Sequence, residues 1–191
     1  NADVQIKFDG LGAKPRLNLK PNYAEAPKKG GTASFTSEMN YPSYVVRGEL
    51  RVIDTSGRTG PKTVQIVPIQ PNGTASFNVP EDGDIIVVHR VYDARGRFDE
   101  TEALALDQRD DRGESVANEE GVDRTAYSRI PVSGGAVTVY GTGVRQGATI
   151  QTLGERITPA PDGSFVLQRI LPSGDQDIQV RVNGAGENVY L

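Results

Sequence analysis

The stretch YVVRGELRVID, residues 44–54, alternates apolar and charged side chains. One side of the alternation carries Val46, Leu50 and Val52, and the other carries Arg47, Glu49 and Arg51. A period of two residues is typical of a β-strand with one face in a core and the other in water. The stretch therefore predicts a half-buried strand, and the same pattern recurs along the chain.

Six further runs have strand character: VQIKF (4–8), TVQIVPI (63–69), IIVVHRVY (85–92), VTVYG (137–141), FVLQRIL (165–171) and DIQVRVN (177–183). The run 85–92 is apolar on both faces, as in a central strand, and Pro68 indicates a sheet edge or a bulge. Turn signals separate the runs at intervals of about 8–12 residues, which is typical of β-sandwiches. We therefore expect an all-β fold.

The segment 106–129 interrupts this pattern. It holds seven acidic and four basic residues, and it has few large apolar ones. We interpret it as an acidic linker or as an excursion docked on one domain, with a short helix possible around 114–120. A boundary near Ile130-Pro131 then gives a first β-sandwich domain at 1–105 and a second, smaller one at 130–191.

The pentapeptide GTASF occurs at residues 31–35 and again at 73–77, and a related DGSF occupies 162–165. A phosphate-binding loop would need more glycines, a lysine and a following helix. Each copy instead follows a proline-containing turn and leads into a strand. We interpret the repeat as one turn-to-strand solution used three times, with Gly supplying the positive φ of the turn.

Composition excludes several classes of function. The chain of 191 residues has a net charge of −4, which argues against nucleic acid as a partner. It has no Cys, and so no disulfide, thiol catalysis or Cys-based zinc site. No apolar run approaches the roughly 20 residues of a membrane-spanning helix, so no transmembrane segment is expected. Because the chain starts without Met and stops inside the strand-like GENVYL, we expect a processed or trimmed part of a longer protein.

Chemically reactive groups are few. His89 is the only histidine, and we interpret it as a strand residue at a core edge or on the solvated face. Adjacent carboxylates occur at Asp99-Glu100, Asp110-Asp111, Glu119-Glu120 and Glu81-Asp82-Asp84. DQRDDRGE (107–114) or PEDGD (80–84) could bind calcium, although neither matches an EF-hand pattern, and the carboxylates within 107–123 could serve a metal-assisted hydrolase. We expect no enzyme activity, and we assign no catalytic residue, metal site or cofactor.

The motif NYPSY, residues 40–44, supplies the only candidates for ligand binding, Tyr41 and Tyr44. Their rings could lie flat against a sugar or a peptide, as in a carbohydrate- or cell-wall-binding module. The alternative is that both tyrosines pack over the end of a sandwich and hydrogen-bond to the backbone there.

Two parts of the chain resemble known families. Residues 137–182 resemble the small bacterial immunoglobulin-like modules of surface and envelope proteins, through turn and strand motifs at Gly143–Ala148, Pro161–Phe165 and Gly174–Val180. NYPSYVVRGELRVID (40–54) and VYDARGRFDET (91–101) are similar to extracytoplasmic sandwich domains of Gram-negative outer-membrane proteins, including those that carry an OmpA-like domain.

This resemblance implies two immunoglobulin-like β-sandwich domains in tandem. It implies a scaffold, spacer or protein-interaction role in a protein exported to the periplasm or cell surface of a Gram-negative bacterium. The partner would be an envelope protein or other domains of the parent chain. The resemblance transfers no catalytic residue.

Overall fold

The computed structural model describes residues 2–10, 13–107, 122–174, 177–184 and 187–190. These residues form antiparallel sheets and, apart from the single 3₁₀ turn η1 (Pro42–Tyr44), contain no helix, which confirms the all-β prediction. The chain divides into two compact units. The central unit holds the described residues between 15 and 132, and the terminal unit holds those of 1–14 and 133–191.

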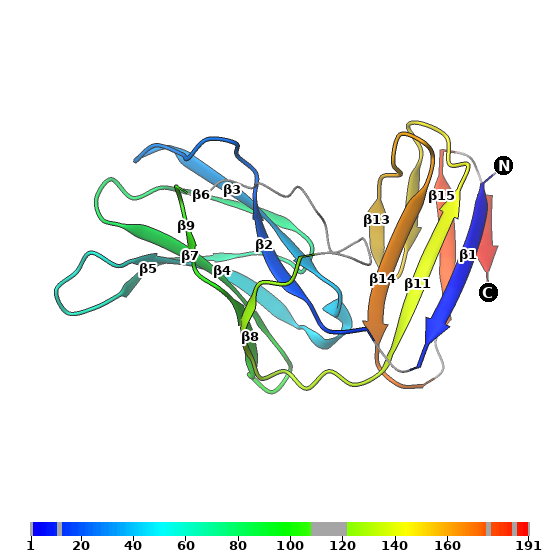
Figure 1. Cartoon of the computed structure of the whole chain (residues 1–191), viewed down its shortest axis with the longest axis horizontal. Helices are drawn as coiled ribbons and strands as arrows, with labels where there is room; N and C mark the ends of the chain where they lie inside the picture. Colours follow the sequence, from blue (N-terminus) through cyan, green and yellow to red (C-terminus); the bar gives the residue numbers. More distant parts are fainter. Residues whose placement is uncertain (1, 11–12, 108–121, 175–176, 185–186, 191) are drawn as a thin grey trace. The chain divides into compact units, whose positions relative to one another are not determined.

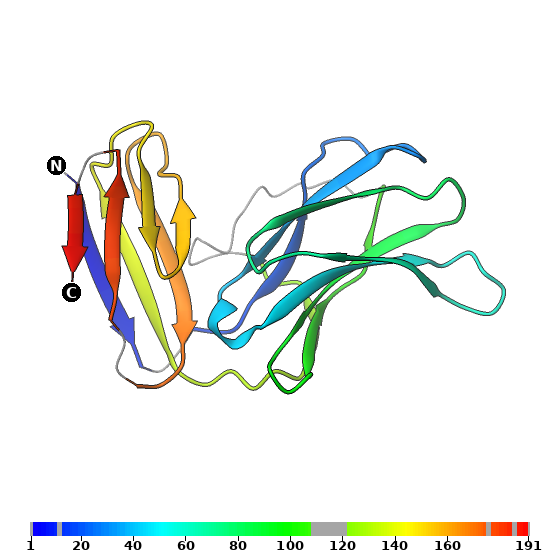
Figure 2. The ribbon, with the colours of Figure 1, turned by 180° about the vertical axis from the view of Figure 1, so that it is seen from behind.

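The central unit has two sheets, which can be followed from both sides in Figures 1 and 2. The larger sheet has the order β10-β8-β7-β4-β5, with β9 also paired to β7, and the smaller has the order β2-β3-β6. The strand bounds are β2 Leu17–Pro21, β3 Thr32–Met39, β4 Arg47–Asp54, β5 Lys62–Pro68, β6 Thr74–Asn78, β7 Ile85–Tyr92, β8 Phe98–Thr101, β9 Leu104–Ala105 and β10 Thr125–Ser128.

One apolar core joins these two sheets face to face. Its buried members come from both layers: Leu19, Ala33, Phe35 and Phe77 from the smaller sheet, and Leu50, Val52 and Val87 from the larger. The alternation in 44–54 therefore corresponds, as expected, to a strand, β4, whose Leu50 and Val52 face the core. Val46 is the exception at 62% exposure, and it precedes the first residue of β4.

Strand order confirms two further predictions. β7 lies between β4 and β8, so the run that is apolar on both faces is an internal strand. β5 is an edge strand that ends at Pro68, and its pairing with β4 shifts register between Val52 and Ile53. The missing N–H of proline costs no ladder hydrogen bond at such a place.

The terminal unit also has two sheets that share a core. One has the order β1-β11-β14, visible in Figure 1 with β1 beside β11, and the other has the order β13-β12-β15-β16. The bounds are β1 Asp3–Asp9, β11 Gly135–Thr142, β12 Thr149–Thr152, β13 Glu155–Ile157, β14 Phe165–Leu171, β15 Gln179–Asn183 and β16 Glu187–Tyr190. The core residues include Val137, Val139, Ile150, Phe165, Val180 and Val182.

Pairing of β1 with β11 joins two parts of the sequence that lie more than a hundred residues apart. Seven residues of β1 pair with seven of β11, from Asp3 opposite Thr142 to Asp9 opposite Ala136. The range 1–105 expected for the first domain thus includes a strand whose partners lie at 135–142. Likewise, the range 106–129 includes β10, which pairs with β8. The helix expected around 114–120 lies outside the described residues.

A buried ion pair links the two sheets of the terminal unit at their edges. Arg169 in β14 is 2% exposed, although it is charged and lies on the core side of its strand. Its Nε and Nη2 both donate to the carboxylate of Glu155 in β13, the second contact at 2.7 Å. Because β14 and β13 are each the last strand of their sheet, this pair closes one side of the unit.

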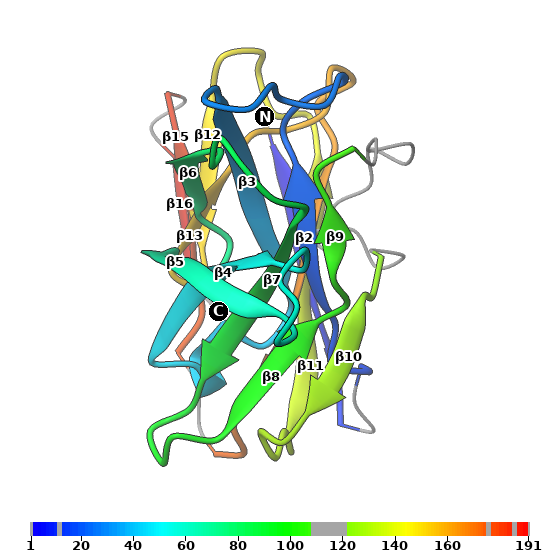
Figure 3. The same ribbon diagram turned by 90° about the vertical axis from the view of Figure 1, so that its left-hand side faces the viewer.

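The two GTASF copies pair with each other. Strands β3 and β6 are neighbours (Figure 3). Their register places Ala33 opposite Phe77, Ser34 opposite Ser76 and Phe35 opposite Ala75. The two phenylalanine rings stack at 5.7 Å between centroids with 9° between their planes. Each large ring therefore faces a small residue on the adjacent strand, which explains the shared composition.

Glycine supplies the positive φ of the turn in the first and third copies, but not in the second, and in the first two copies the residue concerned lies just before GTASF. These two residues are Gly30 with φ 78° and Asn72 with φ 61°. At Gly31 a Cβ would lie 3.0 Å from the carbonyl oxygen of Lys28, and at Gly73 it would lie 3.1 Å from that of Gln70. Glycine is required there because the turn backbone approaches closely. In the third copy Gly163 itself has a φ of 85°.

Candidate functional site

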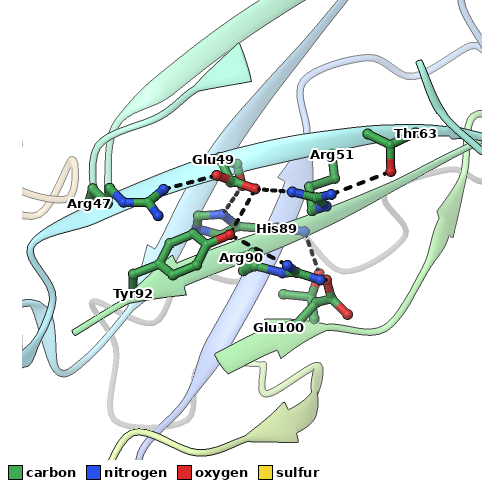
Figure 4. A network of polar contacts seen from close by, with 9 residues as sticks. Arg47, Glu49, Arg51, Thr63, His89, Arg90, Tyr92 and Glu100 are labelled. Carbon is green, nitrogen blue, oxygen red and sulfur yellow. Dashed lines mark hydrogen bonds and ion pairs between the residues drawn. The ribbon is translucent and has the colours of Figure 1, made fainter. Parts of the chain in front are cut away.

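A polar network covers the face of the larger sheet that points away from the core (Figure 4). Its centre is Glu49 in β4, which is only 6% exposed. One carboxylate oxygen accepts from Arg47 Nη1 at 3.1 Å, and the other accepts from Arg51 Nη1 at 2.6 Å and from the Tyr92 hydroxyl at 3.2 Å. A carboxylate this buried is stable only with such partners.

Strand register brings the remaining members together. Arg90 lies directly opposite both Glu49 in β4 and Glu100 in β8. It donates to the Glu100 carboxylate at 3.0 Å and to the Tyr92 hydroxyl at 3.4 Å. Cross-strand pairs of opposite charge stabilise a sheet, and here they form one connected row.

Aromatic rings alternate with the guanidinium groups on this face. Arg47 lies 3.6 Å from the ring centroid of Tyr92, and Arg90 lies 3.9 Å from that of Phe98. Phe98 in turn stacks on Tyr127 of β10 at 4.9 Å. Cation–π contacts of this kind hold the arginine side chains flat against the sheet. The face is therefore an ordered charged surface, from which the Arg47 side chain reaches water with 59% exposure.

His89 lies beneath this network, on the core side of β7, and is fully buried. Its Nδ1 donates to the carbonyl oxygen of Glu49 at 3.1 Å, since a carbonyl can only accept. Its Nε2 then accepts from the Ser37 hydroxyl at 2.7 Å. Burial lowers the pKa of His89 to about 4, although the backbone contact and the charge of Glu49 act in the opposite direction.

The expectation that His89 lies at a core edge or on the solvated face is wrong. A neutral imidazole with both nitrogens hydrogen-bonded is tolerated in a core, because no polar atom is left without a partner. Ser37 belongs to β3 and His89 to β7, so their bond links the two sheets of the central unit. With Ser37 at 1% exposure and His89 at 0%, the hydroxyl is closed to any substrate that would need to reach it.

Tyr41 immediately precedes the 3₁₀ turn η1 between β3 and β4, and Tyr44 is its last residue. The structure places the two side chains differently. Tyr41 is 1% exposed, and its hydroxyl donates to Asp99 Oδ2 at 2.6 Å. Burial and this carboxylate raise the Tyr41 pKa far above its ordinary value. Its ring offers no face to a sugar. Tyr44 is half-buried, and its backbone N–H donates to the Tyr41 carbonyl oxygen at 3.1 Å.

Asp99 organises the chain around Tyr41. Its second carboxylate oxygen accepts from the backbone N–H of Arg129 at 2.7 Å and of Ile130 at 2.8 Å. The aspartate thus fixes the segment that follows β10. Its sequence neighbour Glu100 points to the opposite face of β8, because successive residues of a strand alternate. The adjacent carboxylates 99 and 100 therefore do not converge on one site.

The other carboxylates do not form a metal site in the described residues. Within them, no group of three or more His, Cys, Asp or Glu side chains is placed to hold a metal ion. Asp110-Asp111 and Glu119-Glu120 lie outside the described residues, so the calcium hypothesis for 107–123 stays a prediction. At the end of that range, Asp123 accepts hydrogen bonds from the backbone N–H groups of Leu17 and Thr125.

The polar network itself was not found from sequence, although a signal for it exists. The alternation Arg47, Glu49, Arg51 places opposite charges on one face of one strand. The sequence does not reveal how β4, β7 and β8 pair. Their register brings Arg90 and Tyr92 of β7 and Glu100 of β8 into the network.

Comparison of the chain with family models, with curated proteins and with solved structures found no match. Across the described ranges, no helix combines the length and the apolar character needed to cross a membrane.

Proposed function

We propose that this chain is a non-catalytic structural part of a bacterial cell-envelope protein. In this proposal the two all-β units are immunoglobulin-like β-sandwiches that act as scaffold, spacer or protein-interaction domains. The protein is exported to the periplasm or cell surface of a Gram-negative bacterium. Its partner is another envelope protein or further domains of the same parent chain.

One observation carries the non-catalytic part of the proposal. Four side chains of types that often take part in catalysis here hold the fold together. His89 and Ser37 connect two sheets, and Tyr41 and Asp99 fix the chain after β10. All four are 1% exposed or less. Catalytic and ligand-binding groups need access to their substrate, whereas groups that support a rigid spacer do not.

The experiment compares loss of function with loss of stability. Ser37→Ala and Val139→Ala are introduced separately into the parent protein, and the unfolding free energy and the cellular phenotype are measured for both. If the role is structural, the phenotype follows the stability loss wherever the substitution lies. A fully folded Ser37→Ala protein that loses its function, beside a Val139→Ala protein of equal stability that keeps it, would overturn the proposal.

Location is tested separately. Antibody against the chain is applied to fractions of the cells that produce it, and to intact cells treated with protease. Recovery in the periplasmic or outer-membrane fraction supports the envelope assignment. Recovery in the cytosol alone contradicts it.

A further inference from the structure

Strand β6 carries a sequence that already pairs with its own copy. Inside the central unit, TASF of β6 pairs antiparallel with TASF of β3, and the pairing is centred on Ser34 opposite Ser76. Read in either direction, the pair places Ala opposite Phe and Ser opposite Ser. A strand with this sequence is therefore complementary to a second strand of the same sequence.

The backbone groups of β6 alternate between its two edges. Gly73 accepts from the Ser37 N–H at 2.8 Å, and Val79 donates to the Gly31 carbonyl at 2.8 Å, so the odd-numbered residues point to β3. In an antiparallel strand the N–H and C=O of the residues between them point the other way. Those residues are Thr74, Ser76 and Asn78. Within the described residues, β6 is the last strand of its sheet, and no strand pairs with that edge.

We propose that this free edge of β6 docks a second copy of the chain, with a two-fold axis at Ser76. Ser76 would then lie opposite Ser76 of the other copy, and Ala75 opposite Phe77. These are the combinations that the β3–β6 pair already contains. Exchange at residues 74, 76 and 78 gives about six backbone hydrogen bonds. An isologous contact of this kind closes on itself as a dimer.

The side chains of β6 are compatible with such a continued sheet. Thr74, Ser76 and Asn78 are exposed and polar, whereas Phe77 is 6% exposed and faces the core. Continuing the sheet across the axis would keep polar side chains on the water side. It would also add apolar side chains next to the existing core.

The side chain of Gln65 occupies one hydrogen-bond acceptor at one end of this edge. From the neighbouring strand β5, its amide nitrogen donates to the Asn78 carbonyl oxygen at 3.0 Å. That carbonyl is one of the groups that the second copy must use. Natural sheets often protect their edges against pairing with other chains. Here the protection is a single hydrogen bond, which occupies one of the acceptors of the β6 edge. Removing the Gln65 side chain should therefore strengthen self-association.

Cysteine cross-linking tests the register, because the chain contains no native Cys. In the proposed pair the Ser76 Cα atoms lie about 5.5 Å apart, within the reach of a disulfide. Thr74 lies opposite Asn78, so two Thr74 residues are separated by about 14 Å along the strands. Under oxidation, Ser76→Cys should form a covalent dimer, and Thr74→Cys should not. A mixture of Thr74→Cys and Asn78→Cys should cross-link again.

Sedimentation of the whole chain from micromolar to millimolar concentration tests the affinity. Ser76→Lys puts two like charges on the axis and should raise the dimer dissociation constant at least tenfold, whereas Gln65→Ala should lower it. Circular dichroism should be unchanged for both variants, since Ser76 is exposed and the half-buried Gln65 lies on an edge strand. A wild-type chain that stays monomeric at millimolar concentration would overturn the inference. An unchanged dissociation constant for Ser76→Lys would also overturn it. So would Thr74→Cys cross-linking as efficiently as Ser76→Cys.

Discussion

His89 illustrates how a residue that attracts attention in the sequence can serve the fold. It is the only histidine in the chain, and its imidazole joins the Glu49 carbonyl of β4 to the Ser37 hydroxyl of β3. The bond network requires the neutral ring with its proton on Nδ1. Protonation at Nε2 would remove the acceptor for Ser37 and place a cation in the core.

This requirement makes stability depend on pH. The pKa of His89 is lowered to about 4 in the folded chain, mainly by burial, from an ordinary value near 6.5. Below pH 6.5 the unfolded chain therefore binds a proton that the folded chain does not, so stability falls as the pH falls from 6.5 to 4. We expect a loss of about 3 kcal/mol across this window, measured by denaturant unfolding.

A His89→Gln variant provides the control for this prediction. Glutamine has no titrating group, so the variant should be less stable at neutral pH and should lose the slope between pH 6.5 and 4. A slope that persists in the variant would assign the effect to other groups.

A second prediction concerns the hydroxyl group of Tyr41. Tyr41→Phe removes the hydroxyl that donates to Asp99 and leaves that oxygen of a buried carboxylate without its donor. The expected cost is about 1.5–3 kcal/mol of unfolding free energy. Tyr140→Phe is the matched control, since Tyr140 is 40% exposed and its change should be within about 0.5 kcal/mol. Equal effects of the two substitutions would contradict the assigned role of Tyr41.

At the scale of elements, periodicity was a good guide wherever a strand has one face on a core. Residues 165–171 form β14 over the whole expected run, and the apolar run 85–92 forms the internal strand β7. Periodicity gives the two faces of a strand but not its neighbours. The contacts of Glu49 depend on β4 lying beside β7, which only the three-dimensional pairing decides.

The same limit explains Arg169. In sequence it is a charged residue within FVLQRIL, and its place on the core side of β14 predicts an unfavourable burial. Its partner Glu155 comes from β13, in the other sheet. The local sequence of neither strand predicts this contact, because residues of two different sheets meet only when the sheets pack against each other.

The Arg169–Glu155 pair carries a prediction for the terminal unit. Arg169→Met removes the cation and leaves a largely buried carboxylate, so the unit should lose about 2–4 kcal/mol of unfolding free energy. The double variant Arg169→Met with Glu155→Leu replaces both charges by apolar groups and should recover part of that loss. A double variant less stable than the single one would show that the two charges do not act as a pair.

At the scale of the whole molecule, the chain enters the terminal unit twice. β1 supplies Val4 and Ile6 to the core that β11 and β14 build more than a hundred residues later. The tandem arrangement expected from the sequence could not reveal this, because the run 4–8 has the same strand pattern whichever sheet it joins.

Removal of residues 1–9 tests this connection. The terminal unit should lose roughly 2–4 kcal/mol, since two partly buried apolar side chains and one edge strand are removed. Hydrogen exchange read by mass spectrometry should show faster exchange in 135–142 and unchanged exchange in 85–92 of the central unit. Slower or unchanged exchange in 135–142 would contradict the pairing.

The ends of the central unit are held together as well. Arg124 donates its N–H to the Leu17 carbonyl oxygen at 2.8 Å, and Asp123 accepts from the Leu17 N–H at 3.2 Å. Joining β1 to β11 in an unfolded chain means closing a loop of well over a hundred residues, and that entropic cost grows with loop length. Once the central unit has folded, its two ends are neighbours, and the loop that remains is short. We therefore expect the central unit to fold before β1 pairs with β11, although β1 is synthesised first.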